Sequence, residues 1–255
     1  MSVINDFKAL PTSVKVAYYL VTLSLILNVV TLSLGGGNGG GSVGKWIENN
    51  PQAVLDSVNN YVRKMQEGQQ QQQQGAAKEN IAKYRSDLEN DKRQAVINPK
   101  GKKVIVEFFD YDCPYCRMAA KTTKELLAKR KDIKLILKPL VIHDSAQKAT
   151  ELGIAISLKY PEKFEAYYEA IMVDGQGQST ALIRDAIKKA GLKYEEIEKL
   201  AESRTNDINE IIGEARDIAG KMGVNGTPGF IILNSEGELI PGAVDGAQLE
   251  QIIDR

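Results

Sequence analysis

Apolar and polar positions divide the chain into a long apolar run, a glycine-rich stretch, a thin amphipathic stretch and a longer part with mixed periods. The apolar run, residues 16–34 (VAYYLVTLSLILNVVTLSL), contains no charged residue. As a helix it would extend about 28 Å, close to the hydrocarbon thickness of a bilayer. The pattern therefore predicts a transmembrane anchor at residues 16–34.

The charges on either side of this run predict its orientation. Lys8 and Lys15 precede it, and the first charge after it is Lys45. By the positive-inside rule, residues 1–15 form a cytoplasmic tail and residues 35–255 are exported. A cleaved secretory signal is the alternative, although the run exceeds the usual apolar core of about 7–15 residues and lacks an Ala-x-Ala cleavage site. Either interpretation places the exported part in an oxidising compartment.

A glycine-rich linker at residues 35–45 precedes a helical accessory segment at residues 46–93. Asn50 and Pro51 form a helix-start signature, and a run of glutamines follows at 69–74. The apolar residues that recur at helical spacing are Val54, Val58, Tyr61, Val62, Met65, Ile81, Tyr84 and Leu88. This apolar stripe is too narrow to bury a core by itself. The segment must therefore pack on the main domain or on copies of itself.

Residues 94–255 combine strand-like and helix-like patterns. The expected strands are 103–110, 133–138 and two within 224–242, with Gln94–Ile97 as a short hairpin partner of the first. The expected helices run from Cys113 to Arg130, fill most of 145–222, and close the chain at 247–255. Expected helix boundaries are at Pro161, Ser179, Gly191 and Gly223. This order predicts an α/β domain with a thioredoxin-like fold and a helical insertion at about 145–222.

Composition removes several function classes. Lys and Arg number 33 and so do Asp and Glu, so no charge excess points to a nucleic-acid partner. The chain has two cysteines and one histidine, His143, too few for a four-cysteine zinc site or a disulfide framework. Redox chemistry is therefore the leading use of the two thiols. His143, in a loop, is expected to have no catalytic duty.

Both cysteines stand in the motif Cys113-Pro-Tyr-Cys116, between the first strand and the following helix. Disulfide exchange proceeds through a thiolate, and the N-terminus of a helix stabilises an anion. Cys113 is therefore the expected nucleophile. Cys116, one turn further on, is expected to resolve the mixed disulfide by attacking the Cys113 sulfur. The neighbouring aromatic residues are expected to supply an apolar rim, with some of them in the core; they are Phe108, Phe109, Tyr111 and Tyr115.

VIVEFFDYDCPYC, followed about a hundred residues later by GVNGTPGFII, resembles the DsbA-like family of exported thiol:disulfide interchange proteins. The resemblance implies that Pro114 and Tyr115 tune the redox potential and that Glu107 is a buried acid assisting proton transfer. A strand-edge glutamate facing water is the alternative for Glu107. The resemblance also implies a cis-proline at Pro228, with the Thr227 backbone pairing with an extended client.

No metal site and no organic cofactor are implied by this resemblance. The implied partners are unfolded or misoxidised exported proteins and an unidentified redox-recycling partner. The implied location is the periplasmic side of the bacterial inner membrane, or the soluble periplasm after signal cleavage. The segment IENNPQAVLDSVNNYVRKMQ also resembles the N-terminal helices of suppressor-of-copper-sensitivity type relatives, some of which oligomerise through them. A thiolate-based copper-binding protein and a surface protein with a vestigial CxxC motif remain the alternatives.

Overall fold

The computed structural model describes residues 22, 24, 40–91, 93–175 and 179–255. The expected tail and nearly all of the expected anchor lie outside these residues, so both stay predictions. Within the described residues, no helix combines the length and apolar character needed to cross a membrane. Residues 40–45, expected to belong to the linker, lie in the helix α3 (Gly40–Asn49).

Contacts divide the chain into two compact units, residues 1–68 and residues 69–255. The described part of the first unit comprises α3 and the beginning of α4 (Pro51–Lys83), which starts at the predicted proline. Many of its large apolar side chains are exposed: Val43, Trp46, Ile47, Leu55, Val58, Tyr61, Val62 and Met65. This part of the chain therefore presents an uncovered apolar surface.

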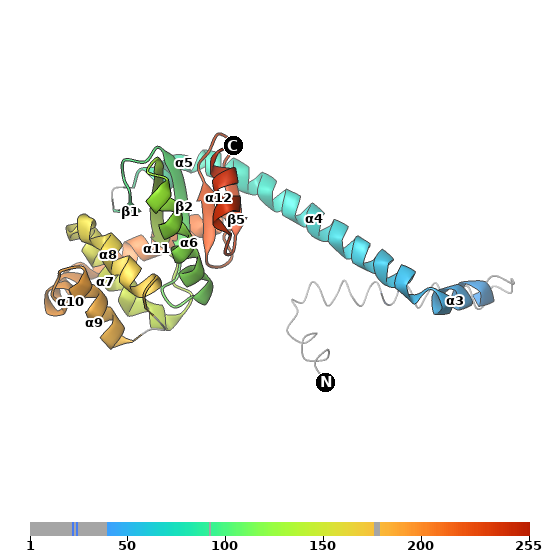
Figure 1. Ribbon diagram of the computed structural model, residues 1–255, viewed down its shortest axis with the longest axis horizontal. Coiled ribbons are helices and arrows are strands. Elements are labelled where there is room, and N and C mark those ends of the chain that lie inside the picture. The colour runs from blue at the N-terminus through green and yellow to red at the C-terminus, as the bar shows by residue number, and fades with distance from the viewer. Residues whose placement is uncertain (1–21, 23, 25–39, 92, 176–178) are drawn as a thin grey trace. The chain divides into compact units, whose positions relative to one another are not determined.

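The second unit is built on one five-stranded sheet with the order β1-β3-β2-β4-β5 (Figure 1). Its strands are β1 (Ala95–Ile97), β2 (Lys103–Phe109), β3 (Ile133–Pro139), β4 (Gly229–Ile232) and β5 (Glu238–Pro241). Strands β2 and β3 are parallel, and all other neighbours are antiparallel. The prediction that Gln94–Ile97 pairs with the first long strand is wrong, because β1 pairs with β3 instead.

Helices cover both faces of this sheet. One face, carrying Ile105 and Phe109 of β2, packs in a core shared with α6 (Pro114–Lys129), α7 (Gln147–Lys159), α8 (Pro161–Met172) and α12 (Gly246–Ile253). The opposite face, carrying Val106 and Phe108, packs against the end of α4, α5 (Arg85–Glu89) and the end of α11 (Thr205–Met222). The central strand is thus buried on both sides.

The end of α4 belongs to the second unit. Ala77 and Ile81 of α4 and Leu88 of α5 are buried in the second core. Gln74 donates a side-chain hydrogen bond to the Leu239 carbonyl on the edge strand β5 at 2.7 Å. Of the two expected roles of the accessory segment, packing on the main domain therefore holds for residues 74–88.

The predicted helical insertion lies between β3 and β4. It consists of the 3₁₀ turn η1 (Asp144–Ala146), α7, α8, α9 (Thr180–Lys189), α10 (Tyr194–Ser203) and α11. The Ser179 hydroxyl accepts from the Leu182 backbone N–H, capping α9 as expected. Gly223 ends α11 with a φ of 76°, a left-handed conformation that glycine adopts without strain.

Candidate active site

Cys113 lies at the junction of a loop and a helix. It occupies the N-cap position of α6, with Pro114 in the first turn. Amides in the first turn of a helix lack intrahelical partners, and their partial positive charge favours an anion at this place. The sequence therefore places the Cys113 sulfur at the N-terminus of a helix, because Pro114 starts the helix immediately after Cys113.

The loop before β4 faces Cys113. The Cys113 thiol donates a hydrogen bond to the Thr227 carbonyl oxygen at 3.3 Å, although the two residues are 114 positions apart. The peptide bond between Thr227 and Pro228 is cis, as the sequence predicts. Both cysteines are free thiols. The two motifs that carried the resemblance thus meet at one site.

Cys116 lies deeper than Cys113. It is fully buried, whereas Cys113 retains 4% of its surface. Burial raises the pKa of the Cys116 thiol, the nearby Glu107 carboxyl raises it further, and hydrogen bonds with the Asp110 backbone and the Thr227 side chain oppose these effects. Cys116 is therefore a thiol that needs a proton acceptor before it can attack a disulfide.

Glu107 is placed inside the protein and not at a water-facing edge. It lies in the middle of β2, between Leu137 of β3 and Phe230 of β4, with no exposed surface. Burial raises its pKa to about 8, so the carboxyl changes its protonation state near neutral pH. An acid of this kind beside Cys116 can accept and return a proton.

Asp110 was missed by the sequence reasoning. Its buried carboxylate accepts hydrogen bonds from the backbone N–H groups of Ile142 and His143 at 2.6 and 2.9 Å, and from that of Asp112 at 2.7 Å. The Ser145 hydroxyl also contacts the Asp112 carboxylate. Asp110 thereby fixes the loop after β3 against the loop that carries Cys113. No local pattern marks this role.

Arg117 was also missed. Its guanidinium donates to the Tyr111 carbonyl and, near the C-terminal end of α8, to the Ile171 carbonyl, both at 2.9 Å. It therefore connects the loop before the cysteines to the helical insertion.

The expected aromatic rim is largely wrong. Phe108, Phe109 and Tyr111 are at most 2% exposed, because helices cover both faces of β2. Tyr115 is exposed as expected. The other exposed large apolar side chains near the cysteines are Met118 of α6 and Ile142 of the loop after β3.

His143 lies in the loop after β3, as expected. Its side chain is half exposed, and its Nδ1 atom lies 3.3 Å from the Asp110 carboxylate. Among the residues that the structure describes, no group of three or more His, Cys, Asp or Glu side chains is arranged to hold a metal ion.

Comparison with known proteins agrees with this geometry. A family model described as a DSBA-like thioredoxin domain matches residues 104–254, more than half of the chain. No curated protein matches the sequence.

Several solved structures are similar. A thioredoxin-like oxidoreductase from Silicibacter pomeroyi DSS-3 is 29% identical with a TM-score of 0.60, over 67% of this chain and 96% of that one. Proteus mirabilis ScsC in a transitional conformation is 26% identical with a TM-score of 0.61, over 84% and 96%. BcfH from Salmonella enterica Typhimurium shares the fold, at 19% identity and a TM-score of 0.65, over 91% and 98%. The chain therefore belongs to the DsbA-like thioredoxin domain family.

Proposed function

We propose that this protein is an exported thiol-disulfide oxidoreductase that forms or isomerises disulfides in client proteins through Cys113 and Cys116. The observation that carries the proposal is the position of the Cys113 thiol, at the start of α6 and 3.3 Å from the Thr227 carbonyl beside the cis-proline. A nucleophilic sulfur at this place is adjacent to backbone that can pair with an extended client.

The reaction runs through a mixed disulfide. In the reducing direction, the Cys113 thiolate attacks a client disulfide, one client sulfur leaves as a thiolate, and a bond forms between Cys113 and the other client sulfur. Cys116 then loses its proton and attacks the Cys113 sulfur, releasing the second client thiolate. The two cysteines lose two electrons and the client gains them. Disulfide formation in a client is the same sequence reversed.

Glu107 is the proposed acceptor of the Cys116 proton. It is buried beside a thiol whose pKa burial raises, and its own pKa of about 8 keeps both protonation states accessible. Pro114 and Tyr115, between the two cysteines, are the proposed determinants of the redox potential. Pro114 starts the helix, and the Tyr115 side chain is 62% exposed.

Client proteins are proposed to dock on an apolar rim formed by Tyr115, Met118 and Ile142. These side chains are 62%, 58% and 52% exposed, and they come from the segments that flank the cysteine pair and from the loop after β3 that Asp110 holds against it. The Thr227 backbone supplies the main-chain contact. Unfolded or misoxidised proteins present apolar extended segments of this kind, so they are the proposed substrates.

The proposed location is the periplasmic side of the bacterial inner membrane, with residues 16–34 as a single-pass anchor, or the soluble periplasm after cleavage. One reaction with a client changes the redox state of the cysteine pair. A separate redox partner must therefore return the pair to its starting state before the next turnover.

The uncovered apolar surface of α3 and the beginning of α4 is proposed to mediate self-association. Leu55, Val58, Tyr61, Val62 and Met65 recur at three- and four-residue steps, which is the spacing of a helix–helix contact. Several copies would present several cysteine pairs to one client, an arrangement that favours isomerisation over simple oxidation.

Two ribonuclease assays test this function. The full-length protein is expected to restore activity to scrambled ribonuclease in a redox buffer, and Cys113→Ala is expected to abolish this. Oxidation of fully reduced ribonuclease in parallel separates oxidase from isomerase. A wild-type protein inactive in both assays would contradict the proposal.

A further inference from the structure

Two buried side chains beside Cys116 have unmet hydrogen-bonding capacity. Among the residues that the structure describes, the two oxygens of the Glu107 carboxyl have no hydrogen-bond partner, and the Tyr168 hydroxyl has none either. Both residues are at most 2% exposed. Native proteins rarely leave such groups unpaired, and those that remain unpaired commonly serve a chemical step.

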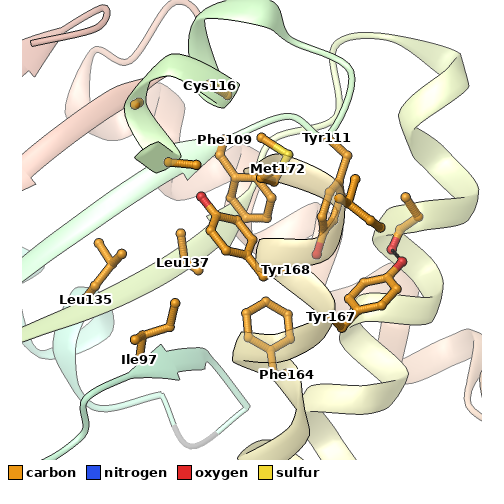
Figure 2. Close-up of a cluster of buried hydrophobic side chains, with 14 of the residues drawn as sticks. Ile97, Phe109, Tyr111, Cys116, Leu135, Leu137, Phe164, Tyr167, Tyr168 and Met172 are labelled. Atoms are coloured by element: carbon orange, nitrogen blue, oxygen red, sulfur yellow. Dashed lines mark hydrogen bonds between the residues drawn. The ribbon is translucent and has the colours of Figure 1, made fainter. Parts of the chain in front are cut away.

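The two groups lie on the same side of the sheet. Glu107 and Phe109 are two residues apart on β2, so their side chains point to the same face. Tyr168, from α8, packs edge-on against Phe109 with ring centroids 5.3 Å apart. Figure 2 shows the Tyr168 hydroxyl directed from α8 toward the part of the cluster that contains Cys116 and Phe109. Burial raises the pKa of Tyr168, and the next causes are the proximity of Glu107 and of Cys116.

Tyr168 also borders a surface cleft. A cleft of about 400 Å³ runs between α6 and α8, and its lining includes Tyr168, the buried Thr123, and the charged residues Lys124, Glu165 and Glu169. Lys124 and Glu169 form an ion pair across it at 2.9 Å. The same tyrosine therefore borders both the buried acid and a water-accessible space.

The groups that face Glu107 from each packed element are few. Its strand neighbours, Leu137 of β3 and Phe230 of β4, carry no polar side-chain atom. From α6 the titratable group is Cys116, and from α8 it is Tyr168. The charges that line the cleft further out are those of Lys124, Lys131, Glu165 and Glu169. Cys116 is the proton donor of the reaction, which leaves the Tyr168 hydroxyl to stabilise the ionised acid.

We propose that Tyr168 is a positioning residue for the resolving step, whose hydroxyl, beside the cleft between α6 and α8, donates a hydrogen bond to the Glu107 carboxylate when Glu107 is ionised. This inference rests on the proposed function. In the step itself, the proton leaves the Cys116 sulfur for Glu107, and the Cys116 thiolate attacks the Cys113 sulfur. The bond between Cys113 and the client breaks, and the client thiolate takes a proton from water.

Tyr167 provides a matched control. It is the next residue on α8 and is equally buried, but its hydroxyl donates to the Ala149 carbonyl at 2.8 Å. Tyr167→Phe removes an existing hydrogen bond, whereas Tyr168→Phe removes none. A purely structural role predicts the larger loss of thermal stability for Tyr167→Phe. The proposal predicts the larger kinetic effect for Tyr168→Phe.

The experiment uses the reduced full-length protein and glutathione disulfide in a rapid acid quench from pH 6 to 9. The first step, formation of the mixed disulfide on Cys113, is expected to stay within about twofold of wild type in Tyr168→Phe. The second step is expected to slow about tenfold at pH 7, and its pH midpoint to rise by about one unit, because a hydrogen bond to the charged form of an acid is lost. Tyr167→Phe is expected to keep the wild-type midpoint.

A double mutant separates the proposed pair from a general disturbance. In a Glu107→Gln background, adding Tyr168→Phe is expected to cause no further slowing, because the hydroxyl acts through the carboxylate. An unchanged midpoint in Tyr168→Phe, or a full additional slowing in the double mutant, would overturn the proposal. If the wild-type protein forms no mixed disulfide, the proposed function itself fails, which is a separate result.

Discussion

Glu107→Gln should stabilise the protein in a pH-dependent way that can be calculated. The pKa of Glu107 rises from 4.5 to about 8 through burial. Between these two values the folded protein holds a proton on Glu107 that the unfolded chain has lost. The free energy of unfolding therefore falls by about 1.4 kcal/mol for each pH unit in this window.

The sign and size of the effect of Glu107 on the free energy of unfolding follow from the two pKa values, 4.5 in the unfolded chain and about 8 in the folded protein. Below pH 4.5 the carboxyl is protonated in both states, so its ionisation contributes nothing. Above pH 8 the folded state carries a buried charge, and the accumulated cost reaches about 5 kcal/mol. At pH 7 the cost is about 3 kcal/mol. Glutamine has a similar shape and does not titrate, so the stability difference between variant and wild type should grow with pH.

Urea unfolding under reducing conditions from pH 4.5 to 8.5 measures this difference. Taking the difference between variant and wild type cancels other titrations. Glu125→Gln, which removes an exposed carboxylate from α6, is the control and should give a nearly flat difference. A flat difference for Glu107→Gln as well would refute the reasoning, because it would mean that the Glu107 carboxyl is solvated in the folded state.

Three further outcomes are expected. Met118→Ser with Ile142→Ser should raise the KM for a protein client severalfold and leave turnover of a small disulfide unchanged; equal losses on both substrates would contradict the docking rim. Ile81→Ala, at a site 1% exposed, should lower the free energy of unfolding by about 2–4 kcal/mol in urea titrations, and a loss below about 1 kcal/mol would show that the end of α4 is not packed on the domain. Tyr61→Glu should reduce the mass measured by sedimentation at a fixed concentration, and an unchanged mass would exclude this face as the association surface.

Local sequence signals predicted most of the fold. The long strands, the helix that starts at Pro114, the cap at Ser179 and the stop at Gly223 each depend on residues within a few positions, and each is confirmed. The cysteine pair was found because strand and helix patterns surround it, and the cis-proline was implied by the family resemblance.

Features that depend on distant contacts were not predictable. The turn before β2 fits a hairpin, but β3 and β4 occupy both edges of β2, so β1 pairs with β3 instead. The aromatic residues near the cysteines were expected to be divided between an apolar rim and the core, but which of them are buried was not predictable. Strand β2 is covered on both faces, which removes the usual alternation of buried and exposed positions.

Tyr168 illustrates the same limit at the site. It lies 61 positions after Glu107 in the sequence, in a helix whose pattern resembles that of any buried helix. Its importance depends on which groups surround its hydroxyl, and that is a property of the packed structure alone.

The most direct test of the account is to trap the mixed disulfide. Cys116→Ser should accumulate a covalent complex with a disulfide-containing client, and mass spectrometry should place the link on Cys113, the thiol that faces the Thr227 carbonyl. Cys113→Ser should accumulate no such complex, because Cys116 is fully buried. A client attached to Cys116 as readily as to Cys113 would contradict the assignment of nucleophile and resolving thiol on which the mechanism rests.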